Sequence, residues 1–150
     1  MLSFRPAAVA DVPALTKVAR QAYRPYVERI GQEPAPMRAD YDAVVARGEV
    51  WVAEDGRNIL GILVLSAEPG YLLVENVAVV PEAQGKGVGK ALMRLAEDRA
   101  AASGLAELRL YTNAAMTENL TYYPRRGYVE THRGQQGGFQ RVFFRKRIGS

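Results

Sequence analysis

Apolar residues recur along this chain with two different periods, and the changes of period predict the order of its elements. Helical spacing marks amphipathic segments at about 12–24, 40–46, 88–103 and 117–126. Alternation, or a short apolar run between turn residues, marks strands at 2–5, 50–54, 59–66, 71–80, 108–112, 128–133 and 139–148. The stretch 31–37 contains prolines and is expected to be a loop. The predicted order is therefore β-α-α-β-β-β-α-β-α-β-β.

Capping residues are expected to set the ends of these helices. Asp11 is the N-cap candidate of the first helix, and Thr117 is expected to cap the last one. Pro25 should end the first helix, because a proline disfavours the helical conformation of the residue before it. Gly104 is the expected C-cap of the helix over 88–103.

The junction between the strand at 71–80 and the helix that follows it indicates a binding site. Its residues are Gln84-Gly85-Lys86-Gly87-Val88-Gly89, and its three glycines leave the start of the helix without side chains. The first amides of a helix have no internal acceptor, and the helix dipole makes that end positive. Lys86 and Lys90 add charge. The junction therefore predicts a phosphate or pyrophosphate site, with a plain glycine turn as the alternative.

Two common phosphate loops do not fit this spacing. A Walker loop needs Ser or Thr after Gly-Lys, but Ala91 follows Gly89-Lys90, and Gln84 stands where the first glycine should be. The dinucleotide fingerprint G-x-G-x-x-G is out of step with glycines at 85, 87 and 89. Nucleotide hydrolysis of the Walker type is therefore not expected.

A third pattern fits at all its fixed positions. Gln84-x-x-Gly87-x-Gly89, after Asn76-Val77-Ala78-Val79-Val80-Pro81, resembles the acyl-CoA pyrophosphate loop of the GNAT N-acetyltransferase superfamily. Tyr122-Tyr123-Pro124-Arg125-Arg126-Gly127-Tyr128 is similar to the second signature of that family, aromatic-Tyr-x-x-x-Gly-aromatic. The resemblance covers about 50–148. It implies an α/β (α+β) GNAT acyl-CoA N-acyltransferase fold: one domain over 1–150 with a mixed, mostly antiparallel central sheet and helices on both faces.

The resemblance implies acetyl-CoA (coenzyme A) as the cofactor. The backbone of the strand would hold the acetyl and pantetheine groups, and the loop amides would hold the pyrophosphate. The residues this implies are Val77, Ala78, Val79, Gln84, Gly85, Lys86, Gly87, Val88, Gly89, Lys90, Asn119 and Tyr123. Many relatives carry an asparagine seven residues before the tyrosine, where this chain has Met116. Asn119, one turn later, is the candidate substitute.

Two residues are the candidates for catalysis. Tyr123 stands where the family keeps its general acid, and a phenol with an ordinary pKa of about 10 can protonate a leaving thiolate. Glu75 is the base candidate, because period-two alternation places it on the same strand face as Val77 and Val79. Burial in that apolar strand would raise its pKa. A core tyrosine and a salt-bridged glutamate are the alternative interpretations.

The first third of the chain is where the family builds its acceptor wall. Tyr23, Tyr26 and Arg29 are the candidate substrate-binding residues, together with Glu75. Aromatic residues with an arginine indicate a small acceptor amine, which can also bear a carboxylate or phosphate, and a structural lid is an equal alternative. A metabolite, an antibiotic amine and a protein N-terminus all remain open as acceptors.

Composition excludes several other classes of protein. The 150 residues suffice for one domain, and no cysteine is present, which excludes disulfides, thiolate metal sites and a cysteine nucleophile. Direct acetyl transfer is therefore favoured. His132 is the only histidine, so no metal is expected. No apolar run approaches the roughly 20 residues that span a bilayer, and the start lacks a signal-peptide pattern, so we expect a cytoplasmic protein without membrane partners.

Positive charge is concentrated near the C-terminus. Residues 125–150 carry seven Arg or Lys against one acid, within a net charge of +4 for the chain. Arg141, Arg145 and Lys146 alternate with apolar residues, as in a strand with one solvated face, so nucleic-acid binding is the weaker interpretation. A non-catalytic acyl-CoA sensor is the other rival to an N-acetyltransferase. The resemblance also implies a homodimer as a candidate assembly.

Overall fold

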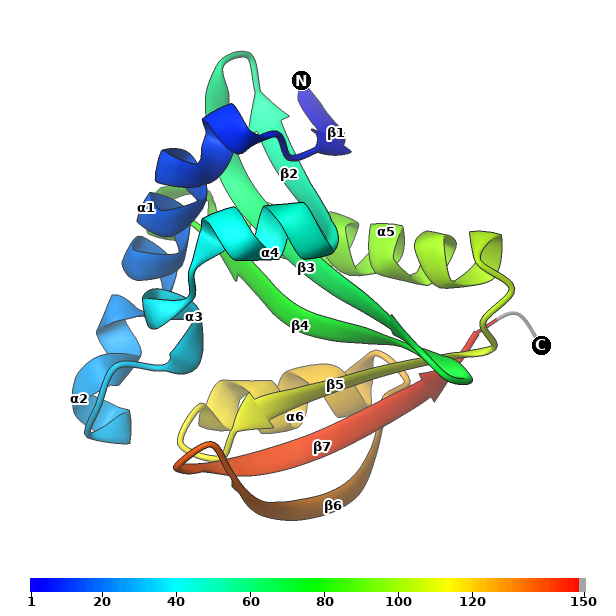
Figure 1. Ribbon diagram of the computed structural model, residues 1–150. Helices are drawn as coiled ribbons and strands as arrows, with labels where there is room; N and C mark the ends of the chain where they lie inside the picture. Colours follow the sequence, from blue (N-terminus) through cyan, green and yellow to red (C-terminus); the bar gives the residue numbers. More distant parts are fainter. Residues whose placement is uncertain (149–150) are drawn as a thin grey trace.

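A computed structural model describes residues 1–148 and shows a single seven-stranded sheet with the order β1-β2-β3-β4-β5-β7-β6 (Figure 1). The strands are β1 (Leu2–Pro6), β2 (Glu49–Asp55), β3 (Asn58–Glu68), β4 (Tyr71–Val79), β5 (Glu107–Asn113), β6 (Val129–Gln136) and β7 (Phe139–Arg147). The helices are α1 (Val12–Tyr23), α2 (Val27–Ile30), α3 (Ala35–Arg38), α4 (Tyr41–Arg47), α5 (Val88–Ala102) and α6 (Thr117–Arg125). Short 3-10 turns are η1 (Val9–Asp11), η2 (Arg24–Tyr26) and η3 (Pro81–Ala83).

The sheet is mixed and mostly antiparallel, as expected, and it is split near its middle. Each neighbouring pair is antiparallel except β4 and β5, which run parallel and pair only from Leu72 to Val74 on β4. Beyond Val74 the two strands diverge, so that β1–β4 and β5–β7 form two halves of a V (Figure 1). The backbone of β4 that faces the opening lacks a strand partner there.

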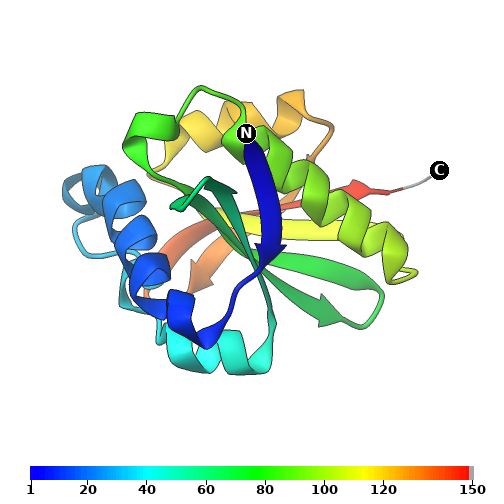
Figure 2. The same ribbon diagram turned by 90° about the horizontal axis from the view of Figure 1, so that it is seen from above.

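Helices lie on both faces of this sheet. Figure 2 shows α5 and α6 on one side, and α1 and α4 on the other. Each layer contributes fully buried apolar side chains to the core, including Leu15 of α1, Ile62 of β3 and Leu92 of α5. Gly61 of β3 lets α5 approach closely, because a Cβ there would lie 2.9 Å from Leu92 Cδ1.

The segment after α1 is more helical than the sequence indicates. As expected, α1 ends just before Pro25, at Tyr23, but Arg24 keeps a helical conformation. Pro25 sits at the start of η2, where its missing N–H has no acceptor to lose. The chain then continues into α2. The expected loop at 31–37 contains the beginning of α3, with Pro36 in its first turn. These short turns bring the chain across the opening of the V (Figure 1).

Two expected caps are formed differently. The carboxylate of Asp11 accepts from the Ala8 amide at 2.7 Å and pairs with Arg5, so it ties η1 to β1 and does not cap α1. Thr117 is the first residue of α6, and Met116 occupies the N-cap position without a side-chain hydrogen bond. The local residues alone do not show whether the side chains of Asp11 and Thr117 cap these helices.

Candidate active site

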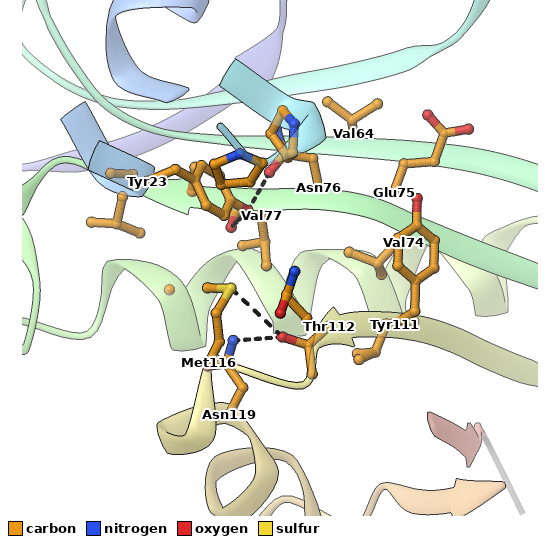
Figure 3. Close-up of a pocket in the computed structure, with 18 of the residues that line it drawn as sticks. Tyr23, Val64, Val74, Glu75, Asn76, Val77, Tyr111, Thr112, Met116 and Asn119 are labelled. Carbon is orange, nitrogen blue, oxygen red and sulfur yellow. Dashed lines mark hydrogen bonds between the residues drawn. The ribbon is translucent and has the colours of Figure 1, made fainter. Parts of the chain in front are cut away.

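One cavity of about 720 Å³ lies at the opening between β4 and β5. Residues of α5 and α6 line it on one side of the sheet, and residues of α1, α4 and β7 line it on the other. Figure 3 shows Val77 and Glu75 of β4 across from Tyr111 and Thr112 of β5. The cavity therefore connects the two faces of the sheet through the gap that the short β4–β5 pairing leaves.

The glycine loop forms one end of this cavity. Gly87 has a φ of 89° and is the N-cap of α5, and Gly85 also has a positive φ. The amides from Gly85 to Lys90 donate no hydrogen bond to the backbone that the structure describes. Gln84 donates its side-chain amide to the Val79 carbonyl at 3.0 Å, which fixes the loop to the end of β4. These open amides at a positive helix end suit an anionic group.

Most of the sequence-predicted cofactor residues line the cavity. Those that do are Val77, Ala78, Val79, Gln84, Gly85, Gly87, Gly89, Lys90, Asn119 and Tyr123. The Lys86 side chain is exposed on the outside of the loop, and the Val88 side chain is buried at the start of α5. Neither side chain lines the cavity. Asn119 donates to the Thr112 hydroxyl at 2.9 Å, and Met116 lies against the same hydroxyl (Figure 3).

Tyr123 projects from α6 into the cavity. Only 7% of the residue is exposed, and its ring packs edge-on against Tyr122 and Tyr128. Burial raises the pKa of Tyr123 above its ordinary value of 10. Its hydroxyl has no hydrogen-bond partner in residues 1–148. Pro124 lies in the last turn of α6, and the helix ends one residue later without turning Tyr123 away from the cavity.

A β-bulge decides where Glu75 points. Val64 of β3 faces Asn76 and Leu65 faces Val74, so Glu75 is an extra residue of β4. Its carboxylate accepts from Arg47 of α4 at 3.1 Å, whereas the Val79 side chain packs beside Gly89 of α5. The expectation that Glu75 shares a face with Val77 and Val79 is therefore wrong, because the bulge interrupts the period-two alternation. Glu75 also remains 27% exposed in its side chain instead of buried.

Asn76 forms a buried polar network that the sequence reasoning missed. Its side-chain oxygen accepts from the Tyr23 hydroxyl at 2.7 Å, and its side-chain nitrogen donates to the Tyr41 hydroxyl at 3.2 Å. Tyr41 in turn donates to the Pro36 carbonyl at 2.6 Å. The network joins α1, α3 and α4 to β4 beside the bulge. A polar residue inside the apolar run at 71–80 was the available signal.

Tyr26 and Arg29 form a bridge over the cavity opening. Arg29 binds the carboxylate of Glu118 on α6 and donates to the Ala115 carbonyl, and Tyr26 donates to Glu118 at 3.1 Å. Gln32 donates to the Gly138 carbonyl in the β6–β7 turn at 3.2 Å. Tyr23 and Tyr26 line the cavity, but Arg29 does not. The guanidinium of Arg29 is therefore part of this bridge, and its role in acceptor binding stays a prediction.

Residues 1–148 contain no cluster of three or more His, Cys, Asp or Glu side chains placed to hold a metal ion. Among the helices formed by these residues, none has both the length and the apolar character needed to cross a membrane.

Comparison with known proteins identifies the family. The family model of the acetyltransferase (GNAT) domain matches residues 46–130, more than half of the chain. This chain belongs to the GNAT acetyltransferase family. The matched part of this GNAT chain contains β4, the glycine loop, α5 and Tyr123. The expected fold is confirmed.

Solved structures show the same fold over nearly the whole chain. The PaiA N-acetyltransferase of Thermoplasma acidophilum, solved with coenzyme A, is 19% identical, with 99% of both chains covered and a TM-score of 0.84. A GNAT acetyltransferase of Elizabethkingia anophelis, solved with acetyl-CoA, is 18% identical, with 98% of both chains covered and a TM-score of 0.72.

One curated relative matches over a shorter region. The IAA acetyltransferase of Azospirillum brasilense is 32% identical over 70 residues, which is 47% of this GNAT chain. The match spans 46%, about half, of that relative's own length.

Proposed function

We propose that this protein is an N-acetyltransferase that moves the acetyl group of acetyl-CoA directly to a primary amine of a small molecule or peptide. The observation that carries the proposal is the cavity through the split sheet, with open amides at one end and Glu75 at the other. A binding site for acetyl-CoA and one for an acceptor can then meet inside the gap. We place this activity in the cytoplasm. Homodimer formation stays a prediction.

In this proposal the α5 and α6 side of the cavity holds acetyl-CoA, which supplies an activated thioester. The amides of Gly85–Lys90 bind its pyrophosphate, and Lys90 adds positive charge. The backbone of β4 at Val77 and Val79 lies along the unpaired edge of the gap, where it can bind the pantetheine arm and stabilise charge on the carbonyl oxygen. Asn119 and Thr112 lie across the gap and contribute polar contacts.

Glu75 and Tyr123 carry the proton transfers in this proposal. The amine attacks as a neutral base, forms an N–C bond and displaces the thiolate as the C–S bond breaks. Glu75 takes the amine proton through water on the α4 side, and Tyr123 gives its phenolic proton to the sulfur. Arg47 orients the Glu75 carboxylate through their ion pair. The chain has no cysteine that could carry the acetyl group between two steps.

Thermal unfolding with acetyl-CoA, free CoA or ATP at matched concentrations tests cofactor binding. A ligand at about 100 times its dissociation constant should add about 2.7 kcal/mol, enough to raise Tm by several degrees. We expect a shift with both CoA species and none with ATP. The absence of a shift with both CoA species would contradict the proposal.

Thiol release separates an enzyme from an acyl-CoA sensor. Because the chain has no cysteine, a thiol reagent reports only the CoA that is set free. We expect release from acetyl-CoA to depend on an added amine. Binding without release on every amine would favour the sensor.

A further inference from the structure

We infer that Arg141 binds an anionic group of the acceptor, so that the acceptor is a small amine that also carries a carboxylate or a similar oxoanion. The inference rests on the proposed function and names the substrate class of the same site. The observations behind it are the set of charged side chains that line the cavity and the contacts that each of these side chains makes.

The charged side chains divide between the two sides of the cavity. In the described chain they are Arg47, Glu75, Lys90, Arg126 and Arg141, so Glu75 is the single acid in this lining. Lys90 belongs to α5, and Arg126 lies over the ring of Tyr122 at the end of α6, so both are on the acetyl-CoA side. The acceptor side therefore contains Arg47, Glu75 and Arg141.

Arg47 and Arg141 differ in their partners. Arg47 donates to the Glu75 carboxylate, which offsets its charge. Arg141 donates to the neutral side chain of Gln136 at 2.8 Å and forms no ion pair with a carboxylate of residues 1–148. A guanidinium has five N–H donors, so most of those on Arg141 are available to a ligand.

Aromatic rings hold the Arg141 guanidinium in place. Its Cζ lies 4.2 Å from the ring centre of Tyr111 on β5 and 5.6 Å from that of Phe139 on β7. Stacking on a ring orients the planar fork and leaves its N–H edge free. A preorganised fork of this kind binds a carboxylate or phosphonate through two parallel hydrogen bonds.

The position of Tyr111 connects this cation to the reaction centre. Figure 3 shows Tyr111 on β5 and Glu75 on β4 on the two sides of the gap. Arg141 stacks on Tyr111. When the amino group of an acceptor lies at Glu75, the opposite end of the acceptor therefore points toward Arg141. The anion and the reacting amine therefore belong to one molecule in this inference.

The bridge over the cavity restricts the size of this molecule. Tyr26 and Arg29 close onto Glu118, and Gln32 closes onto the Gly138 carbonyl beside the β6–β7 turn. These contacts cross the acceptor side between the two halves of the sheet. A small amino acid-like compound fits under such a bridge better than the N-terminus of a folded protein does.

Matched pairs of amines test the inference with the wild-type protein. The pairs are L-phenylalanine and phenethylamine, 4-aminobutyrate and butylamine, and 3-aminopropylphosphonate and propylamine. We expect kcat/KM to be at least 10-fold higher for the anionic member of one pair or more. The first two pairs test a carboxylate, and the third pair tests a phosphonate.

Variants of Arg141 test whether this side chain makes the difference. We expect Arg141→Gln to reduce the preference for the anionic amine by about 10- to 100-fold, mainly through KM, because hydrogen bonds to a charged group are lost. Arg141→Lys keeps the charge without the planar fork and should lose part of the preference; it also serves if Arg141→Gln does not fold. Arg145→Gln, on the same strand outside the cavity, is the matched control and should keep the preference.

Each outcome decides one of the two proposals. A preference for neutral amines in every pair, or an unchanged preference in Arg141→Gln, would overturn the inference. If CoA shifts Tm but no anionic amine is acetylated or stabilises the protein–CoA complex, the role of Arg141 is wrong while acetyl-CoA binding stands. The absence of any shift with CoA would instead contradict the proposed function itself.

Discussion

At the scale of single residues, Tyr123 and Glu75 show how the surroundings of a side chain direct its chemistry. Tyr123 lies in an aromatic cluster, where burial raises its pKa above 10, so the phenol holds its proton at neutral pH. Glu75 lies at a bulge, where its carboxylate pairs with Arg47 of α4. A protonated phenol on one side of the gap and a carboxylate on the other match the two transfers of the proposed reaction.

We expect Tyr123→Phe to lower kcat by about 100-fold or more and to change the Kd of CoA little, because only the proton donor is removed. Steady-state kinetics and a CoA titration measure the two effects. Since the raised pKa keeps the wild-type phenol protonated through pH 10, ionisation of Tyr123 should cause no loss of kcat up to that pH. An unchanged kcat in the variant would remove Tyr123 from the mechanism.

Glu75→Gln keeps the size of the side chain and removes the base. We expect steady-state kinetics to show a fall in kcat of about 100-fold, because the group that accepts the amine proton is lost. The matched control is Glu68→Gln at the end of β3, outside the cavity, which should behave as the wild type. An unchanged kcat for Glu75→Gln would count against the role of Glu75 as base.

At the scale of elements, β4 carries most of the site. Its pairing with β5 stops after Val74, its bulge turns Glu75 toward α4, and its end is fixed to the glycine loop by Gln84. The start of α5 has to lie close to this strand for the loop amides to face the gap. That close approach depends on Gly61 of the neighbouring strand β3.

Gly61→Ala tests this approach. A Cβ at Gly61 would lie 2.9 Å from Leu92 Cδ1 and 3.1 Å from the Ala78 carbonyl oxygen, so the Leu92 side chain and the neighbouring backbone must adjust. We expect the free energy of unfolding to fall by about 1–3 kcal/mol, measured by urea denaturation. Gly134→Ala is the control, because its Cβ would meet no atom within 4 Å. Equal urea midpoints for the two variants would show that the contact has no such cost.

At the scale of the whole molecule, the two halves of the V are joined at both ends of the cavity. The short parallel pairing of β4 with β5 joins them at one end. The contacts of Tyr26, Arg29 and Gln32 with α6 and the β6–β7 turn join them at the other. The second connection is made of exposed side chains, which are worth little individually, so it adds little to the global stability of the fold.

Glu118 determines how this bridge responds to pH. The pKa of its carboxyl is lowered to about 2, first by its own backbone amide and then by Arg29 and Tyr26. Because the folded-state pKa lies below the ordinary value of 4.5, the bridge is complete above about pH 4.5 and is lost as the pH falls toward 2. Glu118→Gln should reproduce that loss at neutral pH.

Hydrogen–deuterium exchange at pH 7 measures the effect. We expect Glu118→Gln to speed amide exchange in residues 24–32, while Tm falls by no more than about 3 °C, since an exposed ion pair contributes little to global stability. Glu130→Gln also removes a surface ion pair, with Arg133, and serves as the control. Unchanged exchange in residues 24–32 would contradict the bridge.

The sequence by itself determined the features that depend on residues close to one another along the chain. Helical spacing of apolar positions predicted the four longer helices, and alternation, apolar runs and turn residues predicted the seven strands. The glycine spacing predicted open amides at the start of α5. These features follow from backbone geometry and burial over a few residues. The resemblance of two short motifs to those of the GNAT superfamily predicted the family and the cavity position of Tyr123.

Only the tertiary structure decided which distant groups meet. The direction of Glu75 depends on a bulge set by pairing with β3, and its partner Arg47 lies 28 residues away. Arg29 was expected at the acceptor, but it binds Glu118, 89 residues away, whereas Arg141 stacks on Tyr111 and keeps its donors free. Strand register and ion pairing between remote segments are settled by packing of the whole chain, because no local pattern specifies either partner.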